Sequence, residues 1–433
     1  MNSPSASVEI TSLSHDGRGV AHDAGKAVFV AGSLPGERVK LGQRRRHRNF
    51  DEAEIAAIES PSPHRVAPRC VHFGVCGGCA LQHLAPDEQL AAKQGHLLEE
   101  LRRTGKVEPQ RLLPPLAGDP WNYRRRARLG AKWVGKKGRV LVGFRERLSP
   151  YLADLRRCEI LAPPVDALID PLAELIGSLS IKARVPQIEV AVAENATALV
   201  FRVLDPPLPA DLERLRLFGA ARGVRIHLQR GGPDSLELLA GDDNPLTYRL
   251  PEFDVELAFE PTDFIQVNAA LNRAMVSRAV ELLAPQSGDR VLDLFCGLGN
   301  FSLPLARRAG EVVGVEGEAG LVERARANAA RNGLRNVEFH SADLAAPVQA
   351  GSWARLQYEA VLLDPPRAGA REVLPVLNGP RVTRVVYISC HTGSLARDAG
   401  LLVHESGFRL TAAGVMDMFP HTAHVESLAL FER

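Results

Sequence analysis

Residues 290–300 read RVLDLFCGLGN, and this stretch decides the fold of the C-terminal part of the chain. The run VLDL predicts a buried strand, and Gly297 and Gly299 predict a tight turn in which the backbone can approach a ligand closely. The next segments, FSLPLARRAG at 301–310 and EVVGVE at 311–316, have the patterns of a helix and a second strand. A strand, a glycine turn, a helix and another strand in this order predict a doubly wound α/β sheet.

The rest of the chain precedes this predicted sheet and has different patterns. Because 433 residues exceed what one hydrophobic core usually supports, we expect several domains. Short alternating runs predict a small OB-like β-barrel at 1–62, and mostly strand-like patterns fill a central domain at 63–260. Residues 261–433, in which strands and helices alternate, are expected to form a Rossmann-like domain. One helix is expected ahead of the central strands, from Pro86 to Gly105.

The residues around the glycine turn indicate which ligand it binds. Glu316 ends the second strand, where a carboxylate commonly accepts hydrogen bonds from ribose hydroxyls. The third glycine of the dinucleotide fingerprint is absent, and Asp293 precedes the turn. These features favour S-adenosylmethionine, which has no phosphate to place at a helix N-terminus, and NAD is the alternative. Asp343, after the third strand, is expected to reach the adenine or, alternatively, to cap a helix.

Two further strand ends carry reactive side chains. LDPPR places Asp364 at the end of a fourth strand, and YISC places Cys390 at the end of a fifth, on the same sheet edge as Glu316. A thiolate at this edge can add to C6 of a uracil and make C5 nucleophilic enough to attack a methyl group. A base must then remove the C5 proton, and Glu426 in HTAHVESLALF is the candidate. The alternative for Cys390 is that of a small buried filler, the commonest role of a free cysteine.

A second group of cysteines precedes the central strands. CVHFGVCGGC spaces Cys70, Cys76 and Cys79 as C-x5-C-x2-C, and Cys158 is the remaining cysteine outside the C-terminal domain. Four thiolates can hold zinc or an iron–sulfur cluster, and the spacing alone does not decide between them. The alternative is a set of unrelated thiols.

The charge of the chain is near neutral overall but unevenly distributed. The net charge is +2, yet residues 44–48 read RRRHR, and residues 121–147 hold ten Lys or Arg and one Glu. Trp121, Tyr123 and Trp133 are interleaved with these basic residues. Such a pattern is typical of phosphate contact combined with base stacking, so we expect the arginines of YRRRAR to bind RNA. The alternative is a solvated face of a sheet.

The composition favours a globular protein that is not in a membrane. Apolar residues make up 45% and charged residues 24% of the chain, and no apolar run approaches the ~18 residues of a membrane span. The N-terminus lacks the basic and apolar regions of a signal peptide. We therefore expect a cytoplasmic protein, without a membrane partner, and a monomer.

The motifs together resemble those of the 5-methyluridine RNA methyltransferases, and most closely the branch that acts on 23S rRNA. They are CVHFGVCGGC, FIQVNAALN, LDLFCGLGNFSLPLA, LDPPRAGA, ISC followed by LARD, and MFPHTAHVES, in the family order and over nearly the whole chain. The resemblance implies an N-terminal TRAM domain that binds RNA, and a [4Fe–4S] cluster held by Cys70, Cys76, Cys79 and Cys158. It implies S-adenosylmethionine contacts at Gln266, Phe295, Asn300, Glu316, Asp343 and Asp364. It also makes Cys390 the nucleophile and Glu426 the base.

The sequence departs from the family pattern after the catalytic cysteine and, beside relatives that carry Asn there, at Asp343. Relatives usually carry Asn-Pro after the catalytic cysteine, where this chain has His391 and Thr392. Two functional alternatives remain beside methylation of 23S rRNA. One is the same chemistry on another rRNA or tRNA uridine, and the other is an iron–sulfur RNA-binding protein without catalysis. The second would predict loss of Cys390, Asp364 or Glu426, and all three are present.

Overall fold

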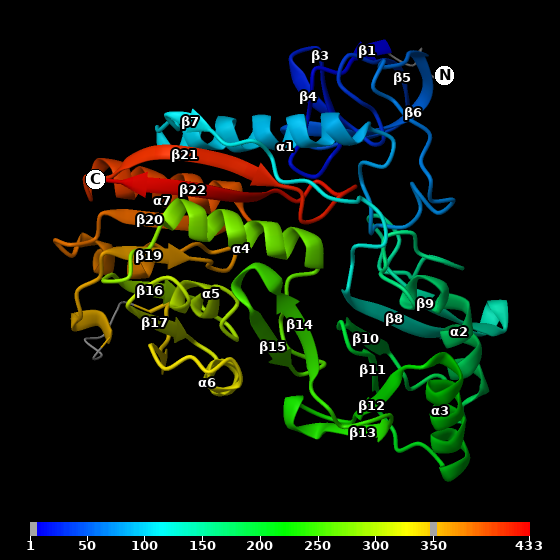
Figure 1. Ribbon diagram of the computed structural model, residues 1–433. Coiled ribbons are helices and arrows are strands. Elements are labelled where there is room, and N and C mark those ends of the chain that lie inside the picture. Colours follow the sequence, from blue (N-terminus) through cyan, green and yellow to red (C-terminus); the bar gives the residue numbers. More distant parts are fainter. Residues whose placement is uncertain (1–6, 347–352) are drawn as a thin grey trace.

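In the computed structural model, residues 7–346 and 353–433 are described, and Figure 1 shows their arrangement. The N-terminal sheet has six strands in the order β1-β5-β6-β4-β3-β2. These are β1 (Ser7–Glu9), β2 (Ser12–Leu13), β3 (Gly19–Asp23), β4 (Lys26–Val30), β5 (Arg38–Arg46) and β6 (Phe50–Ser60). Alternate residues, among them Val28, Val30 and Val39, are fully buried and form a small core of their own.

A second sheet forms the centre of the chain, in the order β13-β12-β11-β10-β8-β9. Its strands are β8 (Arg126–Val134), β9 (Arg139–Gly143), β10 (Gln187–Val192), β11 (Thr197–Arg202), β12 (Arg225–Gln229) and β13 (Leu236–Ala240). Two helices pack against it, α2 (Ile169–Ser178) and α3 (Pro209–Arg222). A separate hairpin, β14 (Leu246–Leu250) and β15 (Val255–Phe259), lies between this sheet and the C-terminal one (Figure 1).

The third sheet has eight strands in the order β18-β17-β16-β19-β20-β22-β21-β7. They are β7 (Arg111–Leu112), β16 (Arg290–Leu294), β17 (Glu311–Glu316), β18 (Val337–Ser341), β19 (Ala360–Leu363), β20 (Arg384–Ser389), β21 (Arg409–Met416) and β22 (Glu426–Glu432). Strands β16 to β20 pair in parallel, whereas β22 lies antiparallel to both β20 and β21. The doubly wound sheet predicted from the glycine turn is therefore confirmed.

Helices cover both faces of this sheet, so its strands are buried on both sides. Val291 joins a core with α4 (Ala269–Leu283), α5 (Ser302–Ala306) and α6 (Ala319–Arg331). Its neighbour Leu292 points the other way, into a core with α7 (Thr392–His404) and α1 (Pro86–Glu100). The short helical turns are Gly135–Lys137, Val165–Ala167, Pro233–Ser235, Pro251–Phe253, Trp353–Arg355 and Arg371–Asn378.

The helix predicted from Pro86 to Gly105 is confirmed, and its place in the fold is unexpected. After α1 the helix continues through a π-helical turn, Leu101–Gly105, and the chain then adds β7 beside β21. Figure 1 shows α1 lying along the C-terminal sheet, although the sequence places it ahead of the central strands. Within the described residues, no helix is long and apolar enough to cross a membrane.

Candidate active site

The glycine turn after β16 lies at the carboxyl edge of the C-terminal sheet. Phe295, Gly297 and Gly299 have positive φ angles of 65°, 55° and 97°, so the chain reverses tightly before α5. Glu316, the last residue of β17, holds the turn in place. Its carboxylate accepts hydrogen bonds from the N–H groups of Gly297 and Glu318, each at 3.0 Å. A left-handed Phe295 is costly, and such strain is common where a backbone is shaped for a ligand.

Carboxyl groups gather behind this turn. Asp293 is fully buried and accepts a hydrogen bond from the Ser302 hydroxyl. Burial raises the pKa of Asp293 to about 7; the Ser302 hydrogen bond opposes this rise, and the charges of Asp364 and Glu316 add to it. Burial also raises the pKa of Asp364 to about 7. The edge of the sheet therefore holds excess negative charge that a bound cation would stabilise.

The other residues expected at the methyl donor lie on neighbouring elements. The side chain of Asn300 accepts from the Tyr248 hydroxyl at 2.9 Å and exchanges two hydrogen bonds with Asn272, at 3.0 and 2.9 Å. The carbonyl of Gln266 accepts from Nε of Arg125 at 2.8 Å. Asn300 is therefore fixed by β14 and α4.

Asp343 makes only a local contact among the described residues. It is exposed and accepts from the N–H of Ala345 at 2.9 Å, which closes a turn after β18.

Cys390 and Glu426 lie opposite each other across the antiparallel pair β20 and β22. Ser389 pairs with Ser427, so the residue after β20, Cys390, faces the first residue of β22, Glu426. Asp364 directly follows β19, whose Leu363 pairs with Tyr387 of β20. The structure thus brings the predicted thiol and both predicted carboxyl groups to one edge of the sheet.

Burial shifts the acidities of this group strongly. It raises the pKa of Glu426 to about 8, and Asp364 adds to the rise, whereas Arg367 and Lys93 oppose it. Burial likewise raises the pKa of the Cys390 thiol to about 11; Glu426 and Asp364 add to this rise, and Arg367 opposes it. A carboxylate with a pKa near 8 is a much stronger base than an exposed one, which suits proton abstraction at neutral pH.

The departure at His391 and Thr392 leaves the start of α7 intact. His391 is the N-cap, and its Nδ1 accepts from the N–H of Ser394 at 3.1 Å. The Thr392 hydroxyl lies 3.1 Å from Nε2 of His96 on α1. An imidazole nitrogen therefore supplies the acceptor that an asparagine side chain offers at such a position.

The four cysteines predicted to act together surround one small cavity, which Cys70, Cys76, Cys79 and Cys158 line with Phe73 and Phe144. Burial raises the pKa of Cys79 to about 12 and that of Cys158 to about 11, and the charges of neighbouring cysteines add to both. Across residues 7–346 and 353–433, however, no three His, Cys, Asp or Glu side chains are grouped closely enough to hold a metal ion.

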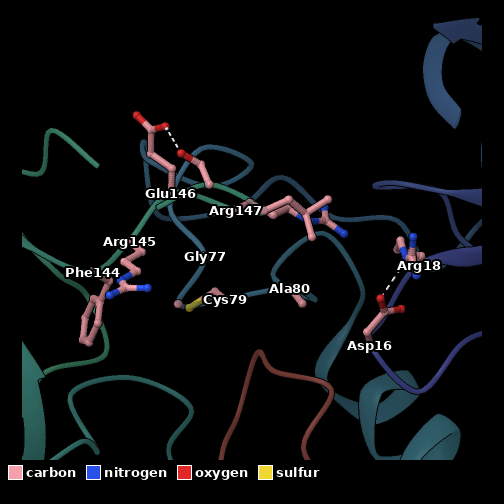
Figure 2. Close-up of a pocket in the computed structure, with 12 residues that line it drawn as sticks. Asp16, Arg18, Gly77, Cys79, Ala80, Phe144, Arg145, Glu146 and Arg147 are labelled. Atoms are coloured by element: carbon pink, nitrogen blue, oxygen red, sulfur yellow. Dashed lines mark hydrogen bonds and ion pairs between the residues drawn. The ribbon is translucent and has the colours of Figure 1, made fainter. Parts of the chain in front are cut away.

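A larger cavity of about 460 Å³ opens beside these cysteines, between the barrel and the central domain (Figure 2). Asp16 and Arg18 line it from the barrel, Cys79 and Ala80 from the cysteine segment (residues 70–81), and Arg145, Glu146 and Arg147 from the chain after β9. Arg18 pairs with Asp16 at 2.7 Å. Arg145 and Arg147 have no ion-pair partner among the described residues, and burial lowers the pKa of Arg147.

Two of the four arginines of YRRRAR, Arg125 and Arg126, do not form the exposed RNA surface that the sequence predicted, whereas Arg128 is exposed. Arg125 is 4% exposed, and its guanidinium lies 4.6 Å from the centre of the Tyr248 ring. Arg126 is half-buried and donates to the carbonyls of Val190, at 3.2 Å, and Pro261. For Arg125 and Arg126 the prediction of an exposed surface was wrong, because arginine stems and guanidinium groups can serve packing and main-chain carbonyls as well as phosphates. RNA contact by the exposed Arg128 stays a prediction. In RRRHR, Arg44 is paired with Asp23 and Asp51, whereas Arg45, Arg46 and Arg48 are exposed.

The polar face of α1 was not predicted from the sequence. Gln89, Lys93 and Leu97 are buried and spaced four residues apart, so they lie on one face of the helix. The only feature of the sequence that could have indicated this buried polar face is the four-residue spacing that places a glutamine and a lysine on the same side of the helix as Leu97. Nζ of Lys93 donates to Asp417 at 2.6 Å and to the carbonyl of Phe419 at 3.0 Å.

The sheet order, the strained glycine turn and the acidic strand ends define the class of this protein, an S-adenosylmethionine-dependent methyltransferase. Residues 210–433 match the tRNA (Uracil-5-)-methyltransferase family, and residues 6–41 match the TRAM domain. The chain is 54% identical to the 23S rRNA (uracil(1939)-C(5))-methyltransferase RlmD of Alkalilimnicola ehrlichii, over 98% of this chain and 96% of that protein. It is 53% identical to the enzyme of the same name from Methylococcus capsulatus, with the same coverage. The chain therefore belongs to the RNA uracil-5-methyltransferase family.

A solved structure has the same fold. The tRNA (uracil-54, C5)-methyltransferase of Pyrococcus abyssi, in complex with S-adenosyl-L-homocysteine, superposes with a TM-score of 0.75. It is 24% identical and covers 98% of this chain and 100% of its own. At this identity the likeness supports the fold, and the chemistry is argued from the residues of this chain.

Proposed function

We propose that this protein methylates C5 of a uridine in 23S rRNA, at the position its relatives' names give as uracil 1939. The observation that carries the proposed chemistry is the pairing of Ser389 with Ser427, which sets Cys390 opposite Glu426 beside Asp364. The relatives cover nearly the whole chain, so their RNA substrate is the best candidate for this one.

The proposed reaction proceeds in two halves. The Cys390 thiolate adds to C6 of the uracil, and the electron pair that this addition places on C5 forms the bond to the methyl group. S-adenosylmethionine supplies that methyl group from a sulfonium, and the bond to sulfur breaks as the new one forms. Glu426 then takes the proton from C5, and the C6–sulfur bond breaks to release the thiolate. A sulfonium at the acidic strand ends adds positive charge, which favours the ionised forms of both Cys390 and Glu426.

We infer that the methyl donor is held by six residues of the C-terminal part of the chain. These are Gln266, Phe295, Asn300, Glu316, Asp343 and Asp364. Glu316 and Asp364 have the strongest support, since one shapes the glycine turn and the other adds negative charge beside Cys390. The exposed position of Asp343 leaves its carboxylate open to a ligand.

For the cysteines we propose a [4Fe–4S] cluster on Cys70, Cys76, Cys79 and Cys158. The donor set fits such a cluster, because the four thiols line one cavity. Burial raises the pKa of each thiol, so ionisation of the free thiols is unfavourable, and binding of the thiolates to iron would compensate for this. The support for this proposal is the shared cavity, since no three His, Cys, Asp or Glu side chains among the described residues are grouped closely enough to hold a metal ion. Anaerobically purified protein should contain about four irons. Stoichiometric zinc would contradict this proposal.

We further propose three domains, at 1–62, 63–260 and 261–433, that together bind the RNA. The TRAM match and the exposed Arg45, Arg46 and Arg48 support a role for the barrel. The cavity of Figure 2 lies between the first two domains and carries Arg145 and Arg147. Guanidinium groups without acidic partners are suited to phosphates.

The decisive experiment compares two variants on unmodified 23S rRNA transcripts with labelled S-adenosylmethionine. Cys390→Ala should form no covalent complex and transfer no methyl group. Glu426→Gln should methylate the RNA but remain attached to it, as a complex that survives denaturing electrophoresis. Its turnover should fall by roughly 100- to 10,000-fold, the usual effect of losing a general base. Mapping the methylated base in the wild-type reaction identifies the uridine, and methylation of tRNA alone would contradict the proposed substrate.

A further inference from the structure

Residues 417–425, which lead into Glu426, make hydrogen bonds to several other parts of the chain. We call these residues the base segment. Helix α1 holds it with two buried side chains. Lys93 donates to Asp417 and to the carbonyl of Phe419, and Oε1 of Gln89 accepts from the N–H of His421 at 3.0 Å. The buried polar face of α1 thus supports this segment.

The cysteine segment and the central domain hold the base segment from the other side. The N–H groups of Ala80 and Leu81 both donate to the carbonyl of His421, at 2.8 and 2.9 Å. The Tyr123 hydroxyl donates to the carbonyl of Pro420 at 3.1 Å, and the ring of Trp121 lies 4.1 Å from that of His421. His421 is kept at a φ of 64°, a costly conformation that these contacts stabilise.

Lys93 brings a buried ammonium to this set of contacts. It is 3% exposed and lies close enough to Glu426 for each charge to affect the other's pKa. Met416, which precedes Asp417, pairs with Glu426 across β21 and β22, so the Lys93–Asp417 pair lies beside the start of β22.

Other ionisable groups lie on the elements around Glu426. Asp364 and Arg367 come from the chain after β19, Cys390 from the end of β20, and His424 and Asp417 from the base segment. Asp364 disfavours the carboxylate, whereas Arg367 and Lys93 favour it. The charges that act on Cys390 are those of Glu426, Asp364 and Arg367. Lys93 is therefore positioned to affect proton abstraction by Glu426.

We propose that Lys93 is a positioning residue for the second half of the reaction, in which it fixes the base segment through Asp417 and Phe419 and keeps Glu426 ready to accept the C5 proton. The inference rests on the proposed role of Glu426 as the general base. It assigns to a helix from the N-terminal half of the chain a function at the C-terminal active site.

Lys93→Met tests this proposal, since methionine fills a similar volume without the charge. We expect the release of methylated RNA from Cys390 to need a higher pH, so that the rate at pH 7 falls about tenfold for each unit by which the apparent pKa rises. Methyl transfer within the covalent complex should keep its wild-type rate. The complex should accumulate at pH 7, as in Glu426→Gln, but raising the pH to 9 should clear it only in Lys93→Met.

A second variant guards against misfolding. Lys93→Met leaves Asp417 buried and unpaired, which is strongly destabilising, whereas Lys93→Met combined with Asp417→Asn removes both charges. The double variant should bind S-adenosylmethionine normally and still show a shift of the release rate to higher pH. This shift should be smaller than in Lys93→Met, because loss of the Asp417 charge partly offsets loss of the Lys93 charge. Equal slowing at every pH in the double variant would overturn the proposal and leave Lys93 with a structural role. Failure of Glu426→Gln to accumulate any complex would instead overturn the proposed function itself.

Discussion

At the scale of a single residue, Glu426 has its chemistry set by burial. It is 7% exposed, and its pKa of about 8 is due first to desolvation and then to Asp364. The unfolded chain exposes the same carboxyl to water, where it titrates near its usual pKa of about 4.3. A group that is more readily protonated in the folded state stabilises the fold at low pH and loses this contribution as the pH rises through its folded pKa.

Glu426→Gln should therefore change the pH dependence of stability in a defined direction. The amide cannot ionise, so the variant should gain stability relative to the wild type between about pH 5 and pH 8.5, by up to ~1.4 kcal/mol per pH unit. Denaturant unfolding of both proteins without S-adenosylmethionine, at three pH values in this range, measures the difference. Other groups also titrate, such as His227, whose pKa burial lowers to about 4. They do so in both proteins, so their contributions cancel in the difference between the two free energies of unfolding. A constant difference across the range would mean that Glu426 is not buried as described.

At the scale of secondary structure, α1 joins the N-terminal half of the chain to the C-terminal sheet. The π-helical turn that ends it approaches α7 at two glycines. A Cβ on Gly105 would collide with the carbonyl oxygen of Ala396, and a Cβ on Gly400 would lie 2.8 Å from the carbonyl oxygen of Gly105. Gly95, in the same helix, has nothing within 4 Å of its Cβ position.

These glycines provide a matched pair of substitutions. Gly105→Ala should lower the free energy of unfolding by roughly 1–3 kcal/mol, because the backbone of α7 must move away. Gly95→Ala should raise it by roughly 0.5–1 kcal/mol, because alanine is the better helix former and meets no neighbour. Thermal unfolding of the two variants checks both signs. If both variants were stabilised, the close packing of α1 against α7 would be wrong.

The elements that the sequence predicted well are those encoded by local patterns. The glycine turn, the strands of the C-terminal sheet and the helix from Pro86 to Gly105 each follow from the spacing of apolar residues and turn formers. The two-residue strand β7 has no such pattern and exists because β21 offers it an edge. The burial of Arg125 was likewise not predicted, because it depends on tertiary contacts. Its partners, Gln266 and Tyr248, are distant in sequence, and no local pattern distinguishes a buried arginine from an exposed one.

At the scale of the whole molecule, the positions of the residues proposed for the active site were predictable, but the contacts that support them were not. Cys390, Asp364 and Glu426 each lie at the end or the start of a strand, a position that a sequence reveals. The hydrogen bonds that hold the base segment come from α1, the cysteine segment and the central domain. They join residues far apart in the sequence, so they form only when these parts of the chain have assembled. The cysteine segment lines the cavity of Figure 2 and also binds the base segment, which leads into Glu426. RNA bound in this cavity would therefore lie next to residues that support Glu426.

The cavity between the barrel and the central domain gives the last prediction. Arg145→Gln combined with Arg147→Gln should weaken binding of 23S rRNA fragments, because two guanidinium groups without acidic partners among the described residues would no longer meet phosphates. The slope of log affinity against log salt should become shallower by about 0.7 for each phosphate of single-stranded RNA that the variant no longer neutralises. Arg335→Gln is the control, because this exposed arginine precedes β18, at the sheet edge opposite the active site. S-adenosylmethionine binding should be unchanged in both proteins. If the double variant kept the wild-type salt slope, the RNA would follow another path, and the exposed arginines of β5 would be the next to test.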